Sequence, residues 1–280
     1  MNNTVQAYTL LNRHQTQDVR KIYNAKIIAC SSASGGVGLS TLIGLLAIIH
    51  EESKQQCVLV DLDIQSGGLD VLLGLEHERG LRIGDVRAPL GKIDDLALNA
   101  ELIQWRNHKV LAHNIWHQET PQWWEVKTIL EALQKHNDLI FIDSSRNVKR
   151  LQKCGVAIHA HIVAVEPTVL GMSRAKAHCI AIAQHYTQYE HNKIPSILLV
   201  VMRTRHATKR VQYVTTQDVQ AYVEYPVAGV IEYDAQLYKR MDMGLSIQKI
   251  SRKNKKALLS LKRLIVTGNA QLNRAKHSKK

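Results

Sequence analysis

The stretch that decides the fold is Ala33-Ser34-Gly35-Gly36-Val37-Gly38-Leu39-Ser40-Thr41. It follows the apolar run from Lys26 to Cys30 and leads into a second apolar segment, from Leu42 to Ile49. A strand, a glycine-rich turn and a buried helix in this order direct backbone N–H groups and a helix N-terminus toward an anion. The stretch therefore predicts a phosphate-binding loop.

The predicted ligand contacts are mostly backbone groups of this loop. They come from Gly35, Gly36, Val37, Gly38, Leu39, Ser40 and Thr41. The hydroxyl of Ser40 is placed to bind Mg²⁺, with Thr41 as the alternative. Loops of this type carry a lysine just before that hydroxyl, and the residue at that position here is Leu39. The sequence predicts a phosphate cradle that has lost its cation.

Three more motifs follow the loop along the chain. Cys57 to Asp63 has the pattern of a buried strand that ends in two carboxylates, and it runs into the glycine-containing segment from Ser66 to Glu76. Asp138 to Ser145 contains a second apolar strand that ends in an aspartate. Val227 to Asp234 contains a short apolar strand, 227–231, followed by a loop. Carboxylates at strand ends beside a phosphate loop are suited to Mg²⁺ and water chemistry.

Taken in order, these four motifs resemble those of the MinD/ParA family of deviant-Walker ATPases, over roughly residues 26–266. The family pattern is Lys-Gly-Gly-x-Gly-Lys-Thr/Ser, and Ser34 and Leu39 stand at its two lysine positions. The resemblance implies ATP or ADP with Mg²⁺ as ligands. It also implies that Asp143 meets Mg²⁺ through water and that Asp63 positions the attacking water. A loop-capping role for Asp143 and a helix-capping role for Asp63 are the alternatives.

One branch of the family is the most similar, the CpaE/TadZ/Ssd group. The shared features are the doubled glycine after Asp63, the stretches Gly80-Leu81-Arg82 and Asp85-Val86, and the lost lysines. Members of this group are MinD-like factors associated with Tad pilus assembly and septum regulation, and many carry a receiver-like domain before the P-loop domain. We expect no such domain in residues 1–25, which are too few to form one.

Apolar strands and helical segments alternate along residues 26–267, which predicts one doubly wound α/β domain with a mostly parallel sheet and helices on both faces. The expected strands are 26–31, 57–61, 109–115, 138–143, 157–165, 196–201 and 227–231. The expected helices are 41–53, 122–136, 169–189, 208–222, 235–242 and 253–266. The last residues, 268–280, are expected to form a basic, disordered tail.

Composition agrees with a cytoplasmic protein of 280 residues. No segment approaches 18 consecutive apolar residues, and the start of the chain lacks the apolar core of a signal peptide. The four cysteines are far apart and form no Cys-x-x-Cys pair, so we expect buried, reduced thiols.

The positive charge is concentrated near the end of the chain. Residues 201–280 contain 17 Lys and Arg against 5 Asp and Glu, a net of +12 (17 − 5), whereas residues 1–200 contain 20 against 19, a net of +1 (20 − 19). Such a region attracts an anionic membrane surface or nucleic acid. A solvated helix and tail with no partner is the alternative. We expect peripheral attachment at the inner membrane face, with DNA as the less favoured partner. The sequence leaves undecided whether the protein forms a homodimer.

Three other features have two interpretations each. His159 and His161 are two residues apart, which suits either a metal pair or histidines of the core or of an interface. The second interpretation is favoured because no third ligand accompanies them. The tryptophans at 105, 116, 123 and 124 suit the core or a partner surface. The final helix has an amphipathic pattern that suits a membrane surface, although the family resemblance implies packing against the sheet.

The sequence thus predicts a MinD/CpaE-like positioning or regulatory protein that acts with a pilus, secretion or division apparatus. Its nucleotide site is expected to bind weakly and to be a poor ATPase, because a missing lysine matters most in the transition state. Two alternatives stay open: an active ATPase in which Arg146 replaces the lysine, and a ParA-like partition protein that binds DNA.

Overall fold

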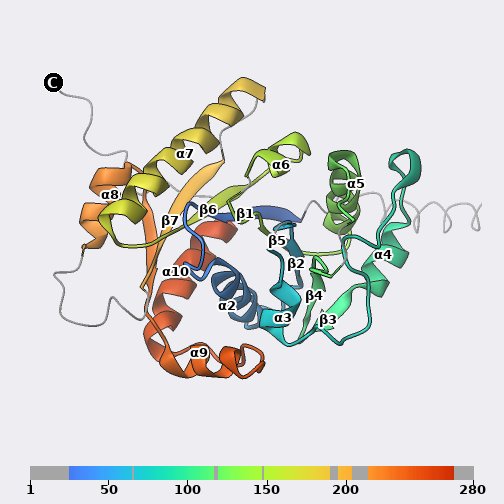
Figure 1. Ribbon diagram of the computed structural model, residues 1–280, viewed down its shortest axis with the longest axis horizontal. Helices are drawn as coiled ribbons and strands as arrows, with labels where there is room; N and C mark the ends of the chain where they lie inside the picture. Colours follow the sequence, from blue (N-terminus) through green and yellow to red (C-terminus); the bar gives the residue numbers. More distant parts are fainter. Residues whose placement is uncertain are drawn as a thin grey trace, which may run out of the picture.

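The computed structural model describes residues 25–64, 66–116, 119–146, 148–189, 195–203 and 214–267. These residues form an eight-stranded sheet with the strand order β3-β4-β2-β5-β1-β6-β7-β8 (Figure 1). The strands are β1 Lys26–Ser32, β2 Cys57–Asp61, β3 Ile103–Trp105, β4 His108–Leu111, β5 Leu139–Asp143, β6 Ala160–Val165, β7 Ser196–Met202 and β8 Val227–Ile231. The pair β3–β4 is antiparallel and the other pairings are parallel, which confirms the predicted sheet.

Helices cover both faces of the sheet (Figure 1). They are α2 Leu39–Glu51, α3 Leu69–Leu73, α4 Asp95–Glu101, α5 Trp123–Gln134, α6 Val148–Lys153, α7 Val169–Tyr189, α8 Thr216–Val223, α9 Ala235–Asp242 and α10 Arg252–Thr267, with a short 3₁₀ turn at Pro89–Gly91. The core next to α2, α3, α9 and α10 is separate from the cores next to α4 to α8. The predicted doubly wound architecture is therefore confirmed.

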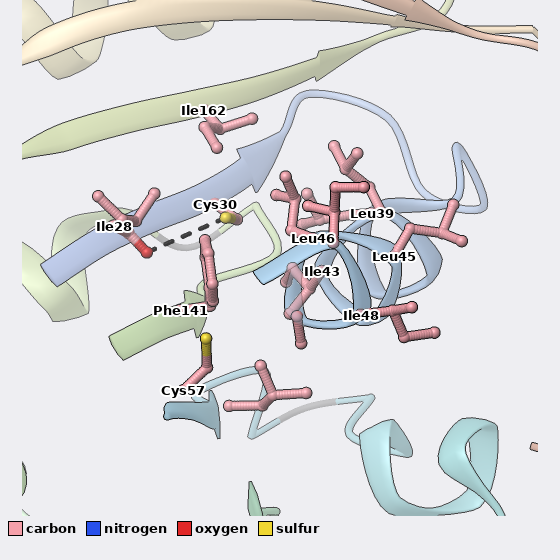
Figure 2. Close-up of a cluster of buried hydrophobic side chains, with 14 of the residues drawn as sticks. Ile28, Cys30, Leu39, Ile43, Leu45, Leu46, Ile48, Cys57, Phe141 and Ile162 are labelled. Atoms are coloured by element: carbon pink, nitrogen blue, oxygen red, sulfur yellow. Dashed lines mark hydrogen bonds between the residues drawn. The ribbon is translucent and has the colours of Figure 1, made fainter. Parts of the chain in front are cut away.

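Strand β1 shows why the central strands are apolar at every position. Ile28 and Cys30 belong to the core on the α2 side, whereas Ile27 and Ala29 belong to the core on the α5 side. Because successive side chains of a strand point to opposite faces, a strand covered on both faces needs an apolar residue at each position. Figure 2 shows Phe141 between Cys30 and Cys57 on the α2 side. All four cysteines lie in the described part of the chain, and none forms a disulfide there.

The expected strand at 109–115 is wrong at both ends. Strand β4 covers only His108–Leu111, and the unpredicted β3 pairs with it through a tight turn in which Arg106 has φ 55°. Beyond β4 the chain turns, and the Asn114 side chain accepts a hydrogen bond from the Trp116 N–H. Side-chain acceptors of this kind end a strand by offering the backbone another partner.

The expected strand at 157–165 begins three residues later, at Ala160. The cause is a side chain in the ladder: the Ile27 N–H donates to Nδ1 of His159 at 3.1 Å, where a backbone carbonyl would otherwise accept. Helices α3, α4 and α6 were not predicted, and α8 covers only the second half of the expected 208–222 helix. Residues 208–213, the N-terminal segment 1–24 and the tail 268–280 lie outside the described residues.

Helix α10 packs against the sheet, as the family resemblance implied. Leu258, Leu261 and Ile265 are buried in the same core as α2, and Lys262 donates from Nζ to the carbonyl of Ile49, near the end of that helix, at 2.9 Å. Among the described residues, no helix is both long and apolar enough to cross a membrane.

The two histidines of the sheet lie in different surroundings. His161 is fully buried, and its Nε2 lies 2.8 Å from Oγ of Ser31, which also lies 2.9 Å from Nε2 of His178. His159 is exposed and is bonded to Ile27. The described residues contain no group of three or more side chains arranged to hold a metal. Burial makes His161 a core histidine, whereas the exposed His159 is not in the core.

Burial makes His161 a source of acid sensitivity. It lowers the pKa of His161 to about 3, so the unfolded chain takes up this proton first as the pH falls. The folded state then loses stability below about pH 6.5, by about 2 kcal/mol at pH 5. We expect His161→Gln to reduce by about that amount the drop in unfolding free energy between pH 7 and pH 5, measured by urea titration. The exposed control His77→Gln should keep the full drop, and an equal drop in both variants would contradict this assignment.

Candidate functional site

The glycine-rich loop connects β1 to α2 at the centre of the sheet, where β1 lies between β5 and β6 (Figure 1). Gly36 has φ 69° and Gly38 has φ 92°, in the left-handed region that favours glycine. A Cβ on Gly38 would also be tightly packed, 3.1 Å from Oη of Tyr238 and 3.3 Å from Cε of Met202, so these side chains would have to move slightly. The backbone conformation is therefore the main reason for glycine at position 38.

The loop presents unpaired backbone donors to open space. The first hydrogen bond of α2 joins the Leu42 N–H to the Gly38 carbonyl at 2.9 Å, so the N–H groups of residues 39–41 precede the helical ladder. No residue in the described ranges accepts from them, and the first turn carries no acidic side chain. Nothing lies within 4 Å of a Cβ built on Gly35 or Gly36. This arrangement fits an anion at the N-terminus of α2.

Ser40 and Asp143 come together beside the loop, as the sequence predicted. The Ser40 hydroxyl donates to Oδ2 of Asp143 at 2.6 Å, and the Ser145 N–H donates to Oδ1 at 3.0 Å. Burial raises the pKa of Asp143, the hydrogen bonds from Ser40 and Ser145 act to lower it, and the charge of Asp63 raises it. A hydroxyl and a carboxylate at this spacing fit Mg²⁺ that keeps most of its water ligands. The bond from Ser145 shows that Asp143 also caps its loop.

Asp61 is a third polar group at this edge, and no role of its own was predicted for it. It lies opposite Asp143 in the β2–β5 pairing and is 1% exposed. Its carboxylate accepts from the N–H groups of Asp63 at 2.9 Å and Leu69 at 3.3 Å, so it holds the start of α3. Burial, followed by the charge of Asp143, raises the pKa of Asp61. Its position as the last residue of a buried strand, two residues before Asp63, was the signal in the sequence.

Asp63 is half-buried and caps the turn that leads into α3. Its Oδ1 accepts from the Ser66 N–H at 3.3 Å, and its carbonyl accepts from the Gly67 N–H at 2.6 Å. Asp63 thus caps a turn and not the helix, because the N-cap residue of α3 is Gly68 and no side chain caps it. Positioning of a water by the same carboxylate stays a prediction.

Neither lysine position holds a side chain that could bind phosphate by charge. Leu39 is 7% exposed and belongs to the core beside α2, near Ile43 and Leu46 (Figure 2). Ser34 is 9% exposed. Arg146, the candidate substitute, is exposed in the turn after β5.

Helix α9 closes the other side of the loop. Asp234 caps its N-terminus by accepting from the N–H groups of Gln236 and Leu237. The ring of Tyr238 stacks on that of Tyr233, with centroids 4.9 Å apart, and its hydroxyl faces Gly38. The fourth sequence motif, which ends at Asp234, therefore lies beside the first in space.

Comparison with known proteins gives one consistent result. No known protein-family profile matches the chain. The septum site-determining protein MinD of Thermotoga maritima is 24% identical over 223 residues, 79% of this chain and 80% of that protein. MinD of Helicobacter pylori is 30% identical over 131 residues, 45% of this chain and 46% of that protein.

Solved structures agree with these relatives. A ParA family ATPase from Chlorobium tepidum superposes with a TM-score of 0.70 at 15% identity, covering 84% of this chain and 98% of that one. The MinC:MinD cell division complex of Aquifex aeolicus gives 0.68 at 18% identity, covering 89% and 99%. The chain has the MinD/ParA P-loop NTPase fold. The Thermotoga relative matches 79% of the chain, so the sequence likeness agrees with the superposed structures on this fold.

Within this MinD/ParA fold, the two carboxylates predicted for the site differ in their bonding. Asp143 is bonded to the Ser40 hydroxyl, whereas Asp63 is bonded to backbone groups of its own turn. We expect Asp143→Asn to remove most of the tightening of ADP binding by Mg²⁺, because the metal loses a carboxylate. Asp63→Asn, the matched control, should leave ADP affinity nearly unchanged. Calorimetric titration of each variant with and without Mg²⁺ tests this, and equal losses in both would show that the two roles are not divided.

Proposed function

We propose that this protein binds ATP or ADP with Mg²⁺ weakly, hydrolyses ATP poorly, and acts as a MinD-like positioning or regulatory protein. The observation that carries the proposal is the 2.6 Å hydrogen bond between Ser40 and Asp143, beside a glycine loop with unpaired N–H donors and no lysine. The parts that hold phosphate and metal are present. The parts that neutralise the charge of the transferring phosphoryl group are replaced by Ser34 and Leu39.

The size of each effect supports binding over turnover. A charge-assisted hydrogen bond contributes roughly 1.5–3 kcal/mol, so the loss of one weakens nucleotide binding by about one to two orders of magnitude. Hydrolysis suffers more, since electrostatic stabilisation of the transition state provides most of the catalysis in phosphoryl transfer. A site of this kind retains the ability to sense nucleotide while losing most of its rate.

The cellular role follows from the relatives. Curated relatives are septum site-determining proteins, and one structural neighbour is a MinC:MinD complex. Together with the motifs of the CpaE/TadZ/Ssd branch, this supports a role in septum placement or in pilus and secretion assembly. Protein partners in that apparatus, a homodimer and peripheral attachment at the inner membrane face belong to the same proposal.

An active ATPase is the second candidate, and Arg146 is the residue on which it rests. Arg146 is exposed, three residues after Asp143, where a guanidinium could approach bound phosphate. The buried position of Leu39 favours the first candidate, because nothing in the glycine loop itself supplies a charge.

A DNA-binding partition protein is the third candidate, motivated by the basic C-terminal region. Several of its lysines have partners within the fold. Lys262 bonds to the end of α2, Lys255 pairs with Glu52 at 2.7 Å, and Lys253 bonds to the Tyr233 carbonyl. Exposed cations stay available on α10 at Arg252, Lys256 and Arg263. The folded part therefore presents less free charge than the sequence total suggests.

Restoring the lysine tests the nucleotide site. Leu39→Lys should tighten ADP binding at least several-fold, because the glycine loop already has its geometry and gains a cation. The aliphatic stem of the new lysine can occupy the space of the Leu39 side chain, while its ammonium group extends beyond that space to the loop. Leu39→Met, which keeps the volume without the charge, is the matched control and should bind as the parent protein does. If a folded Leu39→Lys protein gains no affinity, the loop is not a phosphate site.

Removal of the basic tail tests whether the protein attaches to an anionic membrane surface. Deletion of residues 268–280 removes Arg274, Lys276, Lys279 and Lys280 and no part of the described sheet. The truncated protein should fold normally and bind anionic liposomes more weakly at low salt, since such attraction is screened by ions. Sedimentation with liposomes and with duplex DNA, at two salt concentrations, gives the comparison. Stronger binding to DNA than to liposomes would favour the partition protein, and binding to neither would leave the charge without a partner.

A further inference from the structure

A small cleft lies beside α3, where the chain leaves β2 and β4, and no residue of the glycine loop lines it. Its volume is about 50 Å³, which is room for the end of a side chain and far less than a nucleotide needs. The walls are the apolar side chains of Val71, Ile115 and Trp116, and Glu76 stands at the cleft with Asp70 and Arg82. The cleft therefore combines apolar walls with carboxylates.

The base of the cleft is rigid and its cation is fully used. Arg82 is 8% exposed and pairs with Asp70, with 3.2 Å between Nε and Oδ2. Its remaining N–H groups donate to backbone carbonyls of the loop that follows α3, at Leu75, Glu76, Glu78 and Gly80. Because every donor of the guanidinium is occupied and its charge is balanced, Arg82 cannot recruit an anion.

Glu76 is the carboxylate that stays available. Its side chain is exposed, and no donor in the described part of the chain bonds to it. The surrounding segment is acidic in a basic protein: residues 61–85 contain 6 Asp and Glu against 2 Arg, a net of −4 (2 − 6), whereas the whole chain carries +13. The local charge favours a cation at this cleft.

The apolar walls are unusually open to solvent. Trp116 is 83% exposed, Ile115 44% and Val71 43%. The Asn114 side chain fixes the turn by accepting from the Trp116 N–H at 2.9 Å. A large indole held next to a carboxylate offers a face for a cation and an apolar surface for a methylene chain.

We propose that this cleft binds a lysine or arginine side chain of a protein partner. The cationic head lies against the Trp116 indole and pairs with Glu76, while the aliphatic stem covers Val71 and Ile115. An indole face attracts a cation, and tryptophan and arginine are enriched among the residues that dominate protein–protein affinity. The occupant is a basic segment of another protein.

Because the cleft lies beside α3, a partner bound there can act on the metal site. This step rests on the proposed function. Helix α3 begins at Leu69, whose N–H donates to Asp61, and Asp61 lies opposite Asp143 in the sheet. A partner bound at Val71 therefore holds the helix that borders the metal site.

Tripeptide probes test the cleft without nucleotide, so failure here is separate from failure of the nucleotide site. Acetyl-Ala-Arg-Ala-amide and its lysine counterpart should shift the indole N–H signal of Trp116 in NMR titrations, identified with Trp116→Phe. The citrulline counterpart, which is the same size but uncharged, should bind at least about fivefold more weakly. Equal binding of the citrulline peptide, or no shift at Trp116, would overturn the proposal.

Two substitutions test whether the Glu76 carboxylate, and not another nearby acidic residue, binds the peptide. Glu76→Gln should weaken the arginine peptide at least about threefold, whereas Glu78→Gln, which changes an exposed glutamate outside the cleft, should bind as the parent protein does. Equal affinity of the Glu76→Gln and parent proteins would contradict the assignment. The other possible occupant is a second copy of this chain, which sedimentation of the Trp116→Ala protein tests. If this change converts a dimer to a monomer, the face is an interface between copies and the proposal is wrong.

Discussion

The hydrogen bond from Ser40 to Asp143 is the interaction on which the site depends. It joins the start of α2 to the end of β5, two elements about 100 residues apart in sequence that the parallel pairing of β1 with β5 brings together. Asp143 is buried at the edge where the parallel strands end, and the half-buried Ser40 supplies its carboxylate with a hydroxyl donor. Asp61 lies opposite Asp143 in the sheet and accepts from the Leu69 N–H, so the arrangement reaches the start of α3.

The loss of both lysines changes the balance of this unit without disturbing its shape. The left-handed glycines, the unpaired N–H groups of α2 and the Ser40–Asp143 bond need no cation to form. Leu39 adds apolar burial to the core at the position where a charge would otherwise favour phosphate. Neutral donors bind ground-state phosphate and the more highly charged transition state with less difference than a lysine does. The expected result is a protein that responds to bound nucleotide although it hydrolyses ATP poorly.

Much of the fold could be predicted from the sequence, because strands buried on both faces are continuously apolar. The limits of β2 and β8 follow from that pattern, and the limits of β1, β5 and β7 differ from the expected ones by one residue. Strand β3 could not be found, since its three residues are stabilised by pairing with β4. The late start of β6 depends on the His159 ring in the ladder, and the contact of Tyr238 with Gly38 joins residues 200 positions apart. Such contacts depend on tertiary packing and have no local signal.

The most direct test of this account is a calorimetric titration of the parent protein with ADP, with and without Mg²⁺. The account predicts saturable binding to one site that becomes tighter when Mg²⁺ is added, because the loop supplies donors for phosphate while Ser40 and Asp143 serve the metal. Absence of binding under both conditions, in protein shown to be folded, would contradict it. The glycine loop would then be a structural remnant with no ligand.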